Sequence, residues 1–583
     1  MTKKPYAALP IAWTLIMLVL TLTPAQDMPR TPHWEFLSFD TAAHAGVFAM
    51  LAALYWFSGR RQRRWPQLTA HAGAAVLAGC VLFGALIEVL QYAMHLGRHA
   101  EWTDLVGDSL GAALALVLLA GYSRWRVRQL AASLLLLALA APAARAQTAP
   151  YLPRARRTIE TLAAPAMHGR GYVQGGEHLA AAYLRGRFKK LGLQPLAPNY
   201  TQPFGLDVNT FPGRVELSIM PSIETGDSFQ LLPGIDFIPA PESGRADKLF
   251  GAGLMLLDSL VFRDKGAQQT LQQTLRLEFK ASGRPVLVLT AKQEQGLKQL
   301  PSAVQQTVDS VTARIILVSK LTASLASEQL PTVRLEALAT LPVWASLYKT
   351  HDVRRHDSSL ATIDLDAQLL RNYQTQNLAA VVRGRVQPDS FLVVTAHYDH
   401  LGMMGKSVYF PGANDNASGV ALLLELAAHY ARPENQPACS VAFLLFGAEE
   451  AGLVGSSYFV QHPLVPLKSI RFLVNLDLLG TGEEGATVVN GKVLPVAFQR
   501  LTALNEAHHY LPKLGARGPA ANSDHYPFSQ AGVPAFFLYT RGGSLAYHDV
   551  NDKPAALSLA GFAGAFGLVR EFLDGLGAGP ARR

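Results

Sequence analysis

Four apolar stretches near the N-terminus constrain this chain more than any other feature of its sequence. They cover roughly Ala7–Thr23, Thr41–Phe57, Ala70–Met94 and Leu105–Tyr122. A stretch of about 17–25 mostly apolar residues can cross a bilayer, and there the backbone satisfies its own hydrogen bonds only as a helix or a closed barrel. We therefore expect a four-helix transmembrane domain over residues 1–125.

Basic residues beside these stretches indicate their orientation. Lys3 and Lys4 precede the first stretch, and clusters of Arg follow the second (residues 60–64) and the fourth (residues 124–128). Lys and Arg are enriched on the cytoplasmic side of spanning helices. We therefore expect a multi-pass protein of a bacterial cytoplasmic membrane, with its N-terminus in the cytoplasm and its chain returning there after the fourth span.

A fifth apolar run, LAASLLLLALAAPA at residues 130–143, is short for a span. It follows a basic segment and ends in Ala144-Arg145-Ala146, which is the layout of a secretory signal. We expect residues 126–147 to be an internal signal or a fifth membrane segment. In either case the rest of the chain is extracytoplasmic, and it is periplasmic or secreted if cleavage follows Ala146.

The distribution of charge and the number of cysteines argue against nucleic-acid binding and against cysteine-based sites. The formal net charge of +9 would suit a nucleic-acid-binding protein, but much of the Arg lies beside the apolar segments, so we expect no nucleic-acid partner. The chain has two cysteines, Cys80 and Cys439, which excludes a disulfide framework and a cysteine-based zinc site. Any metal site must use His, Asp and Glu. No oligomeric state follows from the sequence.

The remaining chain divides into three segments by pattern. Residues 148–205 include a helical stretch, GGEHLAAAYLRGRFKKLGL, and form the N-terminal segment of the domain that follows. Residues 206–370 hold short strand-like runs between polar loops, and we expect a β-rich insert domain there that acts as a lid or spacer. Residues 371–578 alternate apolar strands with helices. This alternation predicts an α/β fold, a mixed and mostly parallel sheet sandwiched by helices.

Candidate metal ligands follow the strands of this third segment. The strands are SFLVVTA (390–396), SVAFLLF (440–446), RFLVNLDLL (471–479) and PAFFLYT (534–540). The polar residues at or after their carboxyl ends are His397, Asp399, Asp415, Glu449, Glu450, Asp477 and His548. Ligands bind beyond the carboxyl ends of parallel strands, so we expect these side chains to gather at one edge of the sheet.

These residue types suit a pair of zinc ions, which lie about 3.5–4 Å apart in two-metal sites. Asp415 can bridge the two ions; His397 and Asp477 can complete one site, and Glu450 and His548 the other. Glu449 then remains free to act as a general base, and Asp399 can accept the second imidazole N–H of His397. Each residue alone is more often structural, but five independent coincidences at strand ends favour a metal site.

Two family resemblances support this organisation. The motifs FDTAAHAGVFAMLA, GALIEVLQ and EWTDLVGDSLGA make residues 8–122 resemble the VanZ-like family of small four-helix membrane proteins. The motifs VVTAHYDHLG, GANDNASGVALLLELA, FLLFGAEEAGLVGSSYF, NSDHYPFSQAGVPAFFL and YHDVNDKP make residues 375–555 resemble the M28 family of co-catalytic zinc peptidases, and the likeness extends over about 151–575.

The peptidase resemblance implies the fold of a zinc exopeptidase and the same residue roles. It implies His397, Asp415, Glu450, Asp477 and His548 as ligands of two zinc ions, Glu449 as base and Asp399 as the orienting acid. It also implies peptide substrates, with aminopeptidase activity as our first hypothesis. A glutaminyl-cyclase-like acyltransferase, a carboxypeptidase-type hydrolase and a non-enzymatic scaffold on the same fold remain alternatives. Asp524 and His525, in SDHYPF, are further candidates for lining the pocket.

Overall fold

The computed structural model describes residues 8–21, 39–61, 72–94, 106–117, 119, 151–222, 226–281, 285–350 and 359–578. The chain forms two compact units, residues 1–146 and 147–583, and each is described by itself. The predicted fifth segment, residues 126–147, lies outside the described residues.

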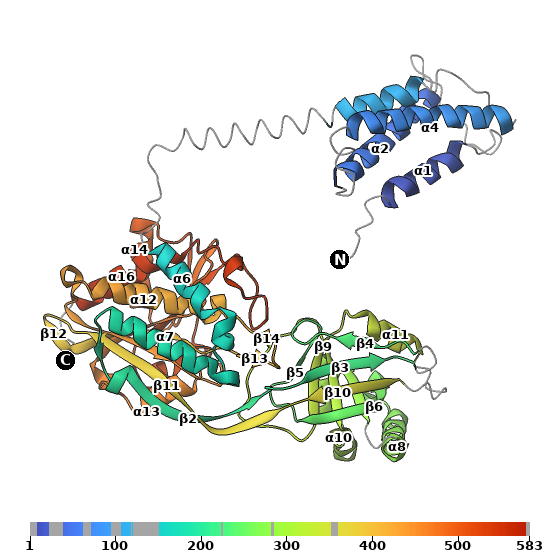
Figure 1. The fold of residues 1–583 in the computed structure, drawn as a ribbon. Coiled ribbons are helices and arrows are strands. Elements are labelled where there is room, and N and C mark those ends of the chain that lie inside the picture. Colours follow the sequence, from blue (N-terminus) through green and yellow to red (C-terminus); the bar gives the residue numbers. More distant parts are fainter. Residues whose placement is uncertain are drawn as a thin grey trace. The chain divides into compact units, whose positions relative to one another are not determined.

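The first unit contains four helical segments among its described residues, namely α1 (Ala8–Thr21), α2 (Phe39–Arg61), α4 (Ala72–Met94) and residues 106–117 (Figure 1). Their shared core includes Met17, Phe48, Cys80 and Leu116. A Cβ on Gly111 would lie 2.1 Å from the carbonyl oxygen of Ala45, so a small residue is needed where these helices meet. By length and composition, one described helix can span a membrane, over Gly73–Leu90.

A nine-stranded sheet organises one half of the second unit. Eight strands follow the order β1-β11-β15-β12-β16-β19-β17-β18, and β2 also pairs with β11. The strands are β1 (Gln194–Pro195), β2 (Thr201–Thr210), β11 (Gln368–Val382), β12 (Gln387–His397), β15 (Cys439–Phe446), β16 (Ile470–Leu476), β17 (Gly485–Val489), β18 (Leu514–Ala516) and β19 (Ala535–Arg541). The central strands β15, β12, β16 and β19 are parallel, and β11 and β17 run antiparallel beside them.

Helices cover both faces of this sheet (Figure 1). They are α6 (Leu152–Leu162), α7 (Gly176–Lys190), α12 (Gly419–Tyr430), α13 (Val454–Gln461), α14 (Pro495–His508), α15 (His525–Gln530) and α16 (Phe562–Gly577). The core on one face joins α6, α7, α12, α14 and α16 to the sheet, and the core on the other face joins α13 and α15. The predicted α/β fold with a mixed sheet is therefore confirmed.

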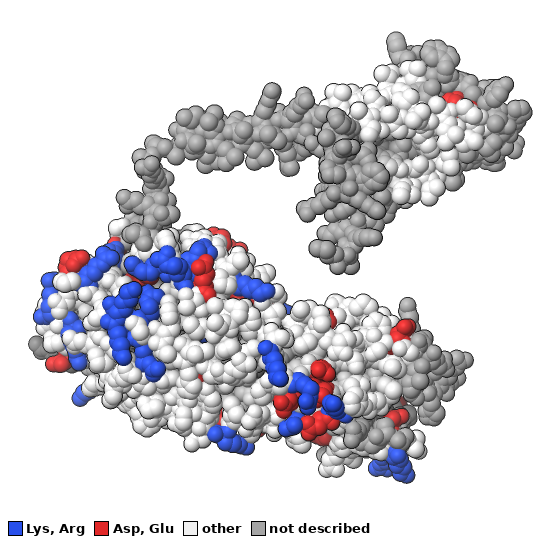
Figure 2. All heavy atoms as spheres, in the orientation of Figure 1, with Lys and Arg blue, Asp and Glu red and all other residues white. Residues whose placement is uncertain are grey.

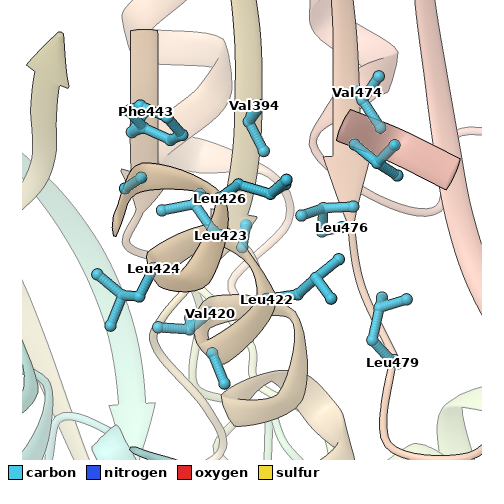
Figure 3. Close-up of a cluster of buried hydrophobic side chains, with 14 of the residues drawn as sticks. Val394, Val420, Leu422, Leu423, Leu424, Leu426, Phe443, Val474, Leu476 and Leu479 are labelled. Carbon is cyan, nitrogen blue, oxygen red and sulfur yellow. The ribbon is translucent and has the colours of Figure 1, made fainter. Parts of the chain in front are cut away.

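Helix α12 fixes the loop that carries Asp415, which directly precedes it. Its sequence GVALLLELAAHY is apolar on almost every side, as expected for a helix buried all round. Leu422, Leu423 and Leu426 pack against Val394, Phe443, Val474 and Leu476 of the central strands (Figure 3). The helix thus fixes the position of the loop that precedes it, which carries Asp415.

A second sheet lies within residues 215–365, in the strand order β4-β3-β10-β6-β7-β8-β9-β5. Its strands are β3 (Val215–Met220), β4 (Phe229–Leu231), β5 (Phe237–Pro239), β6 (Ala246–Leu256), β7 (Val286–Thr290), β8 (Ala313–Val318), β9 (Val333–Leu338) and β10 (Leu360–Leu365). A two-stranded pair, β13 (Met403–Met404) and β14 (Val408–Tyr409), lies in the loop after β12.

This sheet, here called the insert sheet, also carries helices that the prediction of a β-rich insert did not name. They are α8 (Lys265–Ala281), α9 (Ala291–Gly296), α10 (Ser302–Asp309) and α11 (Pro342–Thr350). Helix α8 buries Leu271 and Leu275 against β7, and Gln and Thr occupy the positions between and just before these two leucines. Strands β6, β7, β8 and β9 are parallel, and the crossovers between parallel strands commonly contain helices.

Lys and Arg side chains gather over α6 and α7 (Figure 2). Helix α6 contributes Arg154, Arg156 and Arg157, and α7 contributes Arg185, Arg187, Lys189 and Lys190. Part of the net charge of +9 is therefore concentrated on two helices.

Candidate metal centre

Parallel strands place the predicted site residues at one edge of the nine-stranded sheet. Strand β12 ends at His397, which is in register with Phe446, the last residue of β15. Glu449 and Glu450 follow β15 by three and four residues, and Asp477 follows β16 directly. Because these three strands are neighbours that run in the same direction, the residues that follow them emerge side by side.

Asp415 lies between the two predicted histidine ligands. Its Oδ1 lies 3.3 Å from Nε2 of His397, and its Oδ2 lies 3.2 Å from Nε2 of His548. Each carboxylate oxygen therefore faces a different imidazole. This is the arrangement that a carboxylate bridging two cations requires.

The remaining ligand candidates complete two groups around Asp415. Nε2 of His397 lies 3.4 Å from Oδ1 of Asp477, and Nε2 of His548 lies 3.1 Å from Oε2 of Glu450. Ligand atoms of His397, Asp415 and Glu450 lie within 4.8 Å of one another, and so do those of His397, Glu449 and Asp477. The structure thus brings all five predicted ligand side chains together.

The donor set fits metal ions better than a network of hydrogen bonds. Oδ1 of Asp477 is buried and accepts no hydrogen bond from the described residues, although it faces His397. A buried carboxylate oxygen without a partner is costly, and a cation would satisfy it. Two imidazoles and three carboxylates are ligands that zinc takes.

The two adjacent glutamates differ in their electrostatics. Burial raises the pKa of Glu449 well above its ordinary value, and His397 offsets this only in part. Burial and Asp415 also raise the pKa of Glu450, but His548 and His400 outweigh them and lower it to about 2. Glu450 is therefore the more firmly ionised member of the pair, as suits a ligand, and Glu449 is the member that holds a proton more readily.

The backbone carbonyl of Asp399 lies nearer to the His397 ring than its carboxylate does, whereas the prediction assigned the contact to the carboxylate. Nδ1 of His397 lies 3.3 Å from the backbone carbonyl oxygen of Asp399 and 3.8 Å from its carboxylate Oδ1. A carbonyl oxygen can only accept, so this contact places a proton on Nδ1, and in the neutral ring the lone pair is then on Nε2, the atom that faces Asp415. The Asp399 carboxylate instead accepts the backbone N–H groups of Glu449 and Glu450, at 3.1 and 3.4 Å.

A cavity of about 260 Å³ opens onto this centre. It is lined by His397, Asp415, Glu449, Asp477, Leu478, Arg517, Asn522, Phe537, Tyr539, Tyr547 and His548. Asp524 and His525, which the sequence suggested as further lining residues, are fully buried and are not part of this lining. Three of the lining residues, Phe537, Tyr539 and Tyr547, are aromatic, and they can contact an apolar side chain.

Sequence reasoning did not identify Arg170, which supports the loop before Asp415. Arg170 is fully buried, and its guanidinium donates to five carbonyl oxygens at 2.8–3.1 Å. Those oxygens belong to Leu162, Tyr398, Pro411, Gly412 and Asp415. The sequence signal is an Arg flanked by two glycines in HGRGY, which lets another stretch of backbone approach closely: a Cβ on Gly169 would lie 2.3 Å from the carbonyl oxygen of Gly402.

Asp552 and His400 support the ligands from other sides. The Asp552 carboxylate accepts backbone N–H groups of Asn414 and Asp415 at 2.9–3.0 Å. Nδ1 of His400 lies 2.6 Å from Oε1 of Glu450, so it holds the oxygen of Glu450 that does not face His548. Metal ligands commonly have such hydrogen-bonded partners behind them. The ligand loops are therefore fixed by main-chain and side-chain hydrogen bonds.

Comparison with known proteins agrees with this geometry. Residues 377–573 match the model of peptidase family M28, and residues 8–123 match that of VanZ/LLP1. Aminopeptidase YwaD of Bacillus subtilis is 31% identical over 192 residues, which cover 31% of this chain and 40% of that protein. An aminopeptidase of Pseudomonas aeruginosa is 34% identical over 191 residues, which cover 31% of this chain and 34% of the relative. The matched region thus spans less than half of either relative.

A solved structure shares the fold over a longer range. The zinc aminopeptidase BSAP from Bacillus subtilis superimposes with a TM-score of 0.51 at 21% identity, covering 72% of this chain and 93% of that structure. Both resemblances predicted from the sequence motifs are therefore confirmed as family matches, to peptidase family M28 over residues 377–573 and to VanZ/LLP1 over residues 8–123.

Proposed function

We propose that this chain is a membrane-linked zinc aminopeptidase with two metal ions in its M28 domain. The observation that carries the proposal is the position of Asp415, whose two oxygens face His397 and His548 at 3.3 and 3.2 Å. In this proposal Asp415 bridges the ions, His397 and Asp477 complete one site, and Glu450 and His548 complete the other. The names of the relatives, both aminopeptidases, support the reaction class.

Zinc bound there would polarise the substrate carbonyl and lower the pKa of water. Glu449 lines the cavity, and its Oε2 lies 4.0 Å from Nε2 of His397. We assign it as the general base, which takes a proton from the attacking water and returns it to the leaving amine. Asp399 holds the backbone N–H of Glu449 and so fixes the turn that presents this base.

The size of the cavity favours cleavage at a chain end. Pockets that enclose drug-sized ligands measure about 300–1,000 Å³, so 260 Å³ suits one terminal residue better than an extended peptide. The lining combines Phe537, Tyr539 and Tyr547 with a single cation, Arg517. We therefore expect an apolar or aromatic N-terminal residue to be accepted.

For the first unit, we propose four membrane-spanning helices with the N-terminus in the cytoplasm. The VanZ/LLP1 match and the apolar helices α1, α2 and α4 support this proposal, together with the placement of Lys and Arg. The peptidase domain then lies outside the cytoplasm, where it would meet peptides of the periplasm or medium. The lipid bilayer is the partner of the first unit.

Metal content and substrate selectivity test the enzymatic part together. The purified full chain should hold two zinc ions and should hydrolyse leucine p-nitroanilide but not its N-acetylated form. Asp415→Asn should lose both ions and the activity, while Asp389→Asn, at an exposed site, should keep them. One zinc per chain with ammonia release from N-terminal glutamine peptides would show a cyclase instead, and preference for a free carboxyl end would show a carboxypeptidase.

A further inference from the structure

The loop that carries His548 contacts the insert as well as the half of the unit that contains the nine-stranded sheet. Nδ1 of His548 lies 2.9 Å from the carbonyl oxygen of Ala323, which follows β8 by five residues. The backbone N–H of Ala323 donates in return to the carbonyl oxygen of His548 at 3.0 Å. Nζ of Lys320 lies 3.5 Å from the carbonyl oxygen of Leu545 and 3.9 Å from Oδ2 of Asp549. Several contacts thus join residues 320–323 to residues 545–549.

Apolar packing reinforces these contacts. Leu321 and Ala323 are buried in the core of the insert sheet, and Val550 packs against the same core. Leu401, Met404 and Phe410, from the loop after β12, are also buried there. Two loops of the metal centre are therefore anchored in the insert.

The contact with Ala323 fixes the orientation and the neutral tautomer of the His548 ring. A carbonyl oxygen only accepts hydrogen bonds, so Nδ1 of His548 is the donor, and in the neutral ring that a metal would bind the lone pair is on Nε2. Nε2 is the atom that lies 3.2 Å from Asp415 and 3.1 Å from Glu450. His397 receives the equivalent support from Asp399, two residues away in its own loop.

The backbone of His548 needs support of this kind. Its φ is +54°, in the left-handed region that residues other than glycine adopt uncommonly and that surrounding structure must hold in place. The reciprocal pair of hydrogen bonds with Ala323 holds both the main chain and the ring of His548. An insert that moved away would release both.

We propose that the insert is a positioning part of the metal centre: residues 320–323 hold His548, and the affinity of the ion bound by His548 and Glu450 depends on that contact. This inference rests on the proposed two-metal site and assigns a role to the insert that a lid or spacer would not have. Partners behind a metal ligand typically change metal affinity by about 10–100-fold when they are lost.

The test measures metal binding by the purified full chain as the zinc-buffer concentration is lowered, with cobalt(II) absorption as a second readout. Ala323→Pro removes the N–H that is donated to His548, and Ala323→Ser is its matched control because it keeps both backbone groups. As free zinc is lowered, we expect Ala323→Pro to lose one of its two ions at a concentration about 10–100-fold higher than the concentration at which wild type loses it. The cobalt(II) absorption of Ala323→Pro should be reduced at the same time. Ala323→Ser should bind like wild type.

Charge variants keep the inference testable if Ala323→Pro does not fold. Lys320→Glu places a like charge opposite Asp549 and should weaken the same ion, Lys320→Arg should retain it, and Lys298→Glu, at an exposed site on the insert, should have no effect. Unchanged two-ion binding and cobalt spectra in a folded Ala323→Pro or in Lys320→Glu would overturn the inference. Failure of the wild-type chain to bind two ions would instead refute the proposed function.

Discussion

Replacing Arg170 with Met tests whether the loop before Asp415 is held by this buried guanidinium. The substitution leaves five carbonyl oxygens without their donor, and a buried acceptor without a partner costs about 1–3 kcal/mol. It also removes a buried charge, whose burial itself costs several kcal/mol. Burial indeed lowers the pKa of Arg170 to about 10, while Asp415, Asp552 and other acids oppose that shift.

The net loss of stability should be about 3–5 kcal/mol, the range seen when one partner of a buried charged contact is removed. The shift in Tm per kcal/mol falls as the size of the domain rises and is about 1 °C for a unit as long as residues 147–583, so the Tm of the second unit should fall by roughly 3–5 °C. Arg170→Lys should fall less, because it keeps the charge but offers three donors in place of five.

Activity should fall as well, because two of the five acceptors are the carbonyl oxygens of Gly412 and Asp415. A displacement of about 1 Å at a reacting centre can cost about 10²-fold in rate. Thermal unfolding monitored by tryptophan fluorescence, with kcat/KM on the same preparations, measures both effects. Arg263→Met, at an exposed site, is the control. An Arg170→Met protein that melts and hydrolyses substrate like the control would refute this account of the loop.

Three further predictions concern the base, a buried glutamate and the membrane topology. Glu449→Gln should keep its metal content but lose about 10²–10⁴-fold in hydrolysis; retained activity would remove Glu449 from the role of base. Burial raises the pKa of Glu177 to about 7 despite hydrogen bonds from Tyr373 and Thr375. Because its folded pKa exceeds the unfolded value of 4.5, the folded state binds the proton more tightly, and stability is lost as the pH rises from about 4.5 to 7, by about 3 kcal/mol. The Tm of Glu177→Gln relative to wild type should therefore rise between pH 5 and pH 8, and a constant difference would contradict the shift. A reporter enzyme fused after residue 150 should be active outside the cytoplasm, and activity inside would reverse the proposed orientation.

Part of the candidate site could be predicted from the sequence, because the direction of the parallel strands determines the edge of the sheet at which the residues after them lie. His397, Glu450 and Asp477 lie at or just after the ends of neighbouring parallel strands, so recognising the strands was enough to place these residues together. His548 and Asp415 lie in longer loops that such strands feed, so strand direction predicts the edge at which they lie but not their exact positions. Apolar strands and a continuous apolar helix such as α12 carry strong local signals.

The supporting contacts could not be predicted in the same way. Arg170 binds carbonyl oxygens up to 245 residues away, and Ala323 acts through backbone atoms that every residue possesses. No side-chain pattern encodes such contacts. The helices of the insert were also missed, because α8 and α10 are rich in Gln, Thr and Ser, which resemble loop composition unless the spacing of their few apolar residues is followed.

The pairing of β2 with β11 has a mechanical consequence. These two strands form a ribbon that leads from the nine-stranded sheet toward the insert sheet (Figure 1), and their register shifts between Leu370 and Tyr373. Asn372, inside that shift, has a φ of +49°, and its N–H donates to Asp207 of the opposite strand. A ladder of backbone hydrogen bonds bends most easily where its register is interrupted. If the insert moved relative to the nine-stranded sheet, it would therefore rotate about this interruption. A small angular change at residues 207 and 372 would therefore displace most strongly the parts of the insert that lie farthest from this ribbon.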